Sequence, residues 1–87
     1  MVPLHLRMRR RGLALDVELE DETVRPLLGE LRIVSPLLAS RIEDAVAAHD
    51  PVVHLDDDEV EYLRTAARVL VTNPRVTDPE LRLIAQL

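Results

Sequence analysis

The residues best suited to acid–base or metal chemistry surround a run of consecutive carboxylates at 56–59, Asp-Asp-Asp-Glu. Glu61, Asp50 and two histidines, His49 and His54, lie close to this run in the chain. Carboxylate oxygens suit a hard cation, and imidazole nitrogens add a transition metal as an option. The spacing lacks the alternating ligands, central glycine and distal glutamate of a calcium-binding loop. Whether this cluster binds a metal therefore stays open.

A helix start offers a simpler explanation for the run at 56–61. Side-chain oxygens at that position cap the free N–H groups of the first turn, and their negative charge opposes the positive end of the helix dipole. We favour this structural role and assign no residue as a metal ligand.

Catalytic chemistry has little support elsewhere in the chain. A histidine can exchange protons near neutral pH, but hydrolysis or group transfer also needs a nucleophile or an oriented partner. Cysteine is absent, and Ser35 and Ser40 are explained as a helix cap and an exposed helix position. The sequence has neither a glycine-rich phosphate loop nor a nucleophile elbow. We therefore predict that the protein is not an enzyme and has no cofactor and no small-molecule substrate.

The basic residues gather at 7–11, Arg-Met-Arg-Arg-Arg. A basic two-stranded ribbon can enter the major groove of DNA or follow phosphates. No aromatic side chains alternate with these arginines, and the chain as a whole carries a net charge of -5, which repels nucleic acid. We predict Arg9, Arg10 and Arg11 as partner-binding residues. Plain solvent exposure is the simplest explanation of this basic tip, and among functional uses contact with an acidic protein is favoured over nucleic-acid binding.

These arginines are expected to be positioned by a β-hairpin, because 4–9 and 13–20 alternate apolar and polar residues on either side of Arg10-Arg11-Gly12. One register satisfies both faces of the hairpin. Shifting it by one residue would expose every leucine. The expected pairs are Leu4–Leu19, His5–Glu18, Leu6–Val17, Arg7–Asp16 and Met8–Leu15.

Helix signals follow the hairpin. Thr23 is expected to cap the first helix, Ser35-Pro36 ends that helix and starts another, and Thr77 with Glu80 reads as a capping box. We predict helices at 24–34, 36–49, 57–72 and 79–87. A short strand at 52–55 could lie beside the hairpin.

The apolar positions of these helices predict the core. In the helix at 57–72 they form one arc, which Tyr62 and Val69 widen to about half the circumference. This excess makes Tyr62 and Val69 candidate partner-binding residues. The side chains expected to be buried are Val24, Leu27, Leu28, Leu31, Val34, Leu38, Ile42, Ala45, Val46, Val60, Leu63, Ala66, Ala67, Leu70, Val71, Leu81, Leu83, Ile84 and Leu87, with His49 as a further option.

The length of 87 residues allows one domain, 1–87, of α+β class. No window approaches the roughly 20 apolar residues that cross a bilayer, and no signal peptide is recognised, so a cytoplasmic protein without a membrane partner is expected.

Two functions remain after these exclusions. We favour a non-catalytic protein–protein interaction module, such as a small adaptor, regulatory or inhibitor-type subunit, that binds another protein, a second copy of itself, or both. The alternative is a nucleic-acid-binding regulator that uses the arginine-tipped hairpin and a helix-turn-helix-like corner at Ser35-Pro36. The exposed face expected for the second helix carries Arg41 among acidic residues, which disfavours this alternative.

Overall fold

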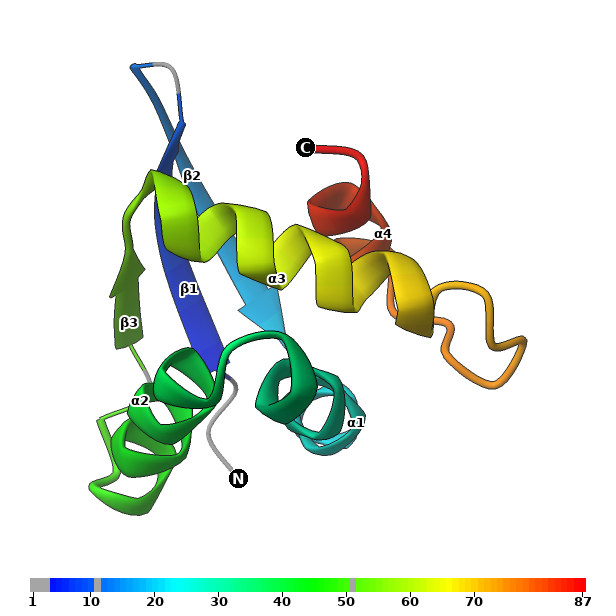
Figure 1. Ribbon diagram of the computed structural model, residues 1–87, viewed down its shortest axis with the longest axis horizontal. Helices are drawn as coiled ribbons and strands as arrows, with labels where there is room; N and C mark the ends of the chain where they lie inside the picture. The colour runs from blue at the N-terminus through cyan, green and yellow to red at the C-terminus, as the bar shows by residue number, and fades with distance from the viewer. Residues whose placement is uncertain (1–3, 11, 51) are drawn as a thin grey trace.

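The computed structural model describes residues 4–10, 12–50 and 52–87, and it has the α+β fold that the sequence predicts. Figure 1 shows a twisted sheet with helix α3 crossing in front of it and the remaining helices around this pair. In chain order the elements are β1 (Leu4–Arg10), β2 (Leu13–Leu19), α1 (Asp21–Val34), α2 (Pro36–Ala47), β3 (Val52–Leu55), α3 (Asp57–Leu70) and α4 (Pro79–Ala85).

The hairpin register is confirmed. β1 and β2 are antiparallel and contain every predicted pair, from Leu4 opposite Leu19 to Met8 opposite Leu15, and Arg10 opposite Leu13 closes the ladder. Just before β2, Gly12 adopts a φ of 80°, a left-handed conformation that favours glycine.

The short strand at 52–55 is also confirmed. β3 runs parallel to β1, with Val53 opposite Leu6 and Leu55 opposite Met8, so the order in the sheet is β2-β1-β3. One face of the sheet is apolar and lies under the helices, while the other carries polar residues such as Arg7 and Asp16. The alternation of β1 explains this division, because neighbouring residues of a strand point to opposite faces.

The first helix begins at Asp21 rather than at residue 24. The carbonyl of Glu20 accepts from the N–H groups of Thr23 and Val24, so α1 starts directly after β2. The prediction that Thr23 is the N-cap is wrong: it is buried inside α1, and Pro26 consequently lies within the helix instead of in its first turn.

A buried carboxylate explains the position of Thr23. The hydroxyl of Thr23 donates to Asp78 at 2.8 Å, and the N–H of Glu80 donates to the same carboxylate at 3.0 Å. Asp78, rather than the predicted Thr77, is thus the N-cap of α4. One side chain caps this helix and ties it to the beginning of α1.

The other three helices end slightly before the predicted residues, at Ala47, Leu70 and Ala85. The end of α2 has a local cause. His49 adopts a φ of 58°, and the N–H groups of His49 and Asp50 donate back to Val46 and Ala45, which closes a Schellman motif. His49 is exposed beyond the helix, so its predicted place in the core is wrong.

The core is aliphatic and centres on α3, which packs against α1, α4 and the sheet. Leu63, Ile42 and Leu81 are completely buried. Two predicted core residues of the helices are exposed instead, Val46 at 41% and Leu83 at 55%, because these helices bury narrower stripes than their apolar patterns suggest. Leu15 of β2, expected on the apolar face of the hairpin, is also exposed, at 37%. No helix among the described residues is long and apolar enough to cross a membrane.

Candidate interaction surfaces

The end of the hairpin displays both charge and apolar surface. Arg9 is exposed on the polar face of β1, and Leu13 and Leu15 of β2 are 70% and 37% exposed. Of Arg10 only the backbone pairing is described, and the predicted residue Arg11 lies outside the described residues. The sequence singled out the arginines but not the leucines, because alternation alone assigned the leucines to the core.

The predicted cross-strand ion pair is present but weak. Arg7 Nε lies 3.8 Å from a carboxylate oxygen of Asp16, and both side chains are more than half exposed, at 57% and 59%. Such pairs contribute about 0–1 kcal/mol because water screens them and the side chains lose freedom. The pair supports the register without fixing it.

The acidic run has a structural use. Asp56 accepts from the N–H of Glu59 at 2.9 Å, and the Glu59 carboxylate accepts from the N–H of Asp56 at 3.2 Å, which makes a complete capping box for α3. Glu59 also pairs with Arg41, whose guanidinium donates to the carbonyl oxygen of His54 at 2.8 Å. This network joins α2, β3 and α3.

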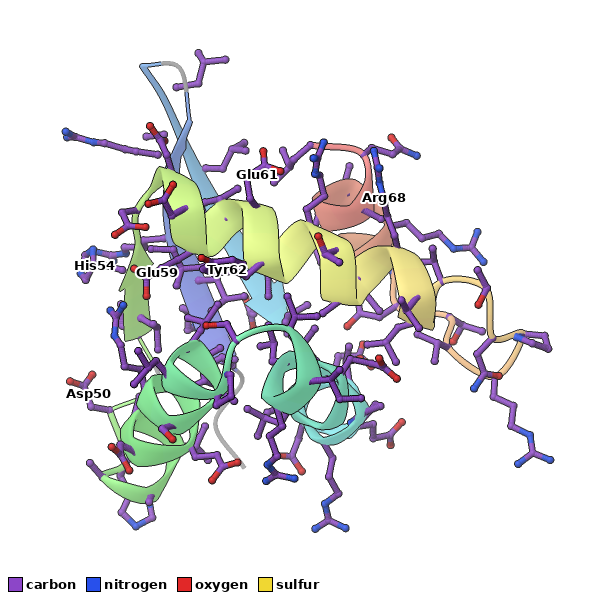
Figure 2. The ribbon with its side chains drawn as sticks, in the orientation of Figure 1. Asp50, His54, Glu59, Glu61, Tyr62 and Arg68 are labelled. Carbon is purple, nitrogen blue, oxygen red and sulfur yellow. The ribbon has the colours of Figure 1, made fainter. Side chains whose placement is uncertain are left out.

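The potential metal ligands are not brought to one point. Figure 2 shows Asp50 near the beginning of β3, whereas His54 and Glu59 lie near its end. Within the part of the chain that the structure describes, no group of three or more histidine, aspartate or glutamate side chains is arranged to hold a metal ion.

An open depression of about 810 Å³ lies where β1, β2, β3 and the start of α3 meet. Met8 and Leu55 provide apolar wall, and Arg9, His54 and Asp57 lie at the polar rim. Charges of both signs are therefore mixed around an open surface, which favours no particular ligand.

The outward side of α3 carries an uncharged stripe, which consists of Tyr62, Thr65 and Val69 and is called the α3 stripe below. Tyr62 is 42% exposed, Val69 is 49% exposed, and Thr65 is also exposed. In Figure 2, Tyr62 lies on the side of α3 toward α1 and α2, and Glu61 and Arg68 lie on the side toward α4. The structure thus places both predicted apolar residues on one accessible surface.

Further apolar exposure occurs at the corner between α1 and α2. Ile33 is 79% exposed and Leu37 is 82% exposed, on either side of Ser35. Neither residue was predicted as a partner-binding site. The available signal was that both lie off the buried stripes of their helices.

The same corner has little positive charge free for phosphate. Arg41 is held by Glu59 and the His54 carbonyl, and Arg32 pairs with Glu43. A helix that reads DNA presents free basic side chains to the groove, and these two arginines already have acidic partners.

Comparison with known proteins adds no assignment: no family model, no curated protein and no solved structure matches this chain.

Proposed function

We propose that the chain is a non-catalytic protein–protein interaction module that self-associates, in the role of a small adaptor, regulatory or inhibitor-type subunit. The observation that carries the proposal is the α3 stripe. Two large side chains of the helix at the centre of the core, Tyr62 and Val69, face solvent one above the other. A cytoplasmic location stays a prediction.

The energetics of the α3 stripe favour burial against another protein. Removing apolar surface from water contributes roughly 25 cal/mol per Å², and tyrosine is enriched among the residues that dominate binding energy at interfaces. Thr65, between the two larger residues, is small and uncharged, so a facing surface can approach closely.

The sheet supports the same proposal. The order β2-β1-β3 leaves β2 and β3 as edge strands, and such edges attract other strands unless they are obstructed. The carbonyl of His54 on β3 is already occupied by Arg41, and α4 packs near β2. These contacts restrain pairing at the edges, so the helical face is the more suitable contact surface.

The test is sedimentation velocity on the purified chain between low and high micromolar concentration. We expect a concentration-dependent dimer, and we expect the double variant Tyr62→Ser/Val69→Ser to remain monomeric because the apolar contact is lost. The control is Leu37→Ser, a similar change at a residue that is 82% exposed outside the α3 stripe. A wild-type chain that stays monomeric at high micromolar concentration would contradict self-association.

A further inference from the structure

We propose that the edge of β2 binds an extended segment of another protein, which adds a fourth strand to the sheet and alternates basic with apolar residues. The contact uses residues 13–18. The inference goes beyond the self-association proposed above, because this surface lies on a different element from the α3 stripe. It names the chemical class of a partner for the interaction module.

The edge of β2 is open for hydrogen bonding. The order of the sheet places β1 on one side of β2 and no strand on the other. In such an edge strand, every second residue directs its N–H and C=O groups away from the sheet. Among the described residues, none outside β1 forms a hydrogen bond with the backbone of residues 13–18. An added strand would therefore find these groups without partners.

β2 also lacks two features by which proteins usually obstruct an edge strand, prolines and bulges. The seven residues of β2 contain no proline, and they pair with β1 without a bulge from Leu13 to Leu19. β3, at the other edge, has only four residues, and its His54 carbonyl accepts from Arg41. β2 is therefore the edge better suited to an added strand.

The helices cover only part of this edge. Val17 and Leu19 are buried, whereas residues 13–16 and Glu18 are exposed. Figure 1 shows the end of the hairpin extending beyond both α3 and α4. The half of β2 nearest the end of the hairpin is thus accessible, and only the half nearest α1 lies where α4 can restrain pairing.

The polar face of the edge is acidic. Asp16 and Glu18 are two residues apart, so they lie on one face of β2, and both are exposed. Asp16 has one weak ion pair, with Arg7 on the β1 side. The directly opposite residues of an added strand would have Cβ atoms about 4.5–5.5 Å away, where opposite charges attract. Basic side chains on the polar face of the partner therefore match this edge.

The other face of the same edge favours apolar residues. Leu13 and Leu15 belong to the apolar face of the sheet, yet they are 70% and 37% exposed. Apolar side chains of an added strand would lie beside them and remove part of their surface from water, which is favourable. The chain itself contains a strand of this type, because β1 alternates leucine or methionine with histidine or arginine and pairs with the opposite edge of β2.

Charge disfavours a second copy at this edge. If two copies of β2 paired antiparallel over their full length, Asp16 would face Asp16 of the other copy, and like charges directly opposite are destabilising. A pairing centred on Ala14 avoids this contact, but it uses only the end of the strand and leaves Glu18 unpaired. A strand with basic residues matches the whole edge.

The test uses synthetic eight-residue peptides that alternate arginine with valine, and fluorescence anisotropy measures their binding to the full chain. The arginine peptide is expected to bind, and a matched glutamate–valine peptide is expected to bind about tenfold more weakly. The double variant Asp16→Arg/Glu18→Arg should reverse this preference. The control Glu22→Arg/Asp44→Arg makes the same charge changes at exposed positions of α1 and α2 and should leave the preference unchanged.

A second measurement separates strand addition from simple charge attraction. Peptides that are N-methylated on every arginine or on every valine keep the same charge, but only one of them loses the N–H groups that face β2. We expect that peptide to bind about tenfold more weakly and the other to keep most of its affinity. Hydrogen exchange of the complex is expected to show slower exchange at alternate amides within residues 13–18.

Circular dichroism melting checks that the variants fold. If the reversed variant melts early, Asp16→Asn/Glu18→Gln replaces it and should weaken binding of the arginine peptide by a few fold. Absence of binding, equal binding of the two charge types, or equal losses in the two methylated peptides would overturn strand addition.

The outcomes also separate this inference from self-association. A chain that binds the arginine peptide as expected but stays monomeric would support strand addition and contradict self-association. A wild-type dimer that binds neither peptide would do the reverse. A wild-type dimer that the arginine peptide dissociates would show that a second copy occupies the edge of β2, which would overturn the choice of partner.

Discussion

At the scale of single residues, His49 has a backbone conformation that its side chain disfavours. Its φ of 58° lies in the left-handed region, where a β-carbon approaches the following carbonyl oxygen. The Schellman motif requires this conformation, since it directs the N–H groups of His49 and Asp50 back to the last turn of α2. Glycine adopts this conformation without the steric cost.

His49→Gly is therefore expected to raise the free energy of unfolding by about 0.5–1 kcal/mol, the steric gain less the extra entropy of an unfolded glycine. Urea unfolding measures the change. The control is Ala47→Gly in the last turn of α2, which is expected to lower stability by up to about 1 kcal/mol. Equal losses in both variants would show that the left-handed residue carries no strain.

At the scale of elements, Asp78 determines how two helices far apart in the sequence are joined. It is 7% exposed, and its carboxylate accepts from the hydroxyl of Thr23 in α1 and from the N–H of Glu80 in α4. The N–H of Glu20, at the end of the hairpin, points to the same carboxylate at 3.4 Å. The beginnings of both helices and the end of β2 thus meet at one side chain.

Asp78→Ala is expected to lower the free energy of unfolding by about 2–3 kcal/mol, because it removes a helix cap and leaves the buried hydroxyl of Thr23 without an acceptor. Chemical denaturation measures the loss. Asp78→Asn keeps one carbonyl acceptor and should lose less. Asp50→Ala, at an exposed aspartate, should change stability little. A loss in Asp78→Ala no larger than in Asp50→Ala would contradict this role.

At the scale of the whole molecule, stability depends on one aliphatic core. The sequence contains a single aromatic residue, Tyr62, and that residue is 42% exposed. Leucine, isoleucine, valine and alanine side chains, together with Met8, therefore fill the space between the sheet and the helices. At the usual 0.05–0.15 kcal/mol per residue, a chain of this length is stable by roughly 4–13 kcal/mol.

Leu63→Ala is expected to cost about 2–5 kcal/mol, the range for truncating a leucine that is fully buried in a core. Such a loss is a large part of the total stability. The matched control is Leu37→Ala, the same change at a residue that is 82% exposed, where about 0.5 kcal/mol or less is expected. Thermal melting of both variants tests whether α3 is the centre of the core.

The sequence also predicted most of the elements. Alternation in the first twenty residues fixed the hairpin register, because a shift by one residue would expose a complete apolar face. Proline and capping signals located the corner at Ser35. The acidic run at 56–59 indicated the start of α3, which begins at Asp57 after the N-cap Asp56. The exposed positions of Tyr62 and Val69 followed from the arc being wider than one core can cover. These features depend on residues that are close together in the chain.

Features that join distant segments were decided by the tertiary structure. The sequence predicted Thr77 as the cap of α4 from its spacing to Glu80, but Asp78 takes the role, and Thr23, buried in α1, supplies a second donor to its carboxylate. In the sequence nothing close to Arg41 indicates its partners. In the folded chain, β3 and α3 bring the His54 carbonyl and Glu59 into contact with it. The packing of α4 likewise leaves Leu83 exposed. Local sequence determines the spacing of apolar residues along each helix or strand. Only the assembled core determines which neighbours the side chains of that element contact.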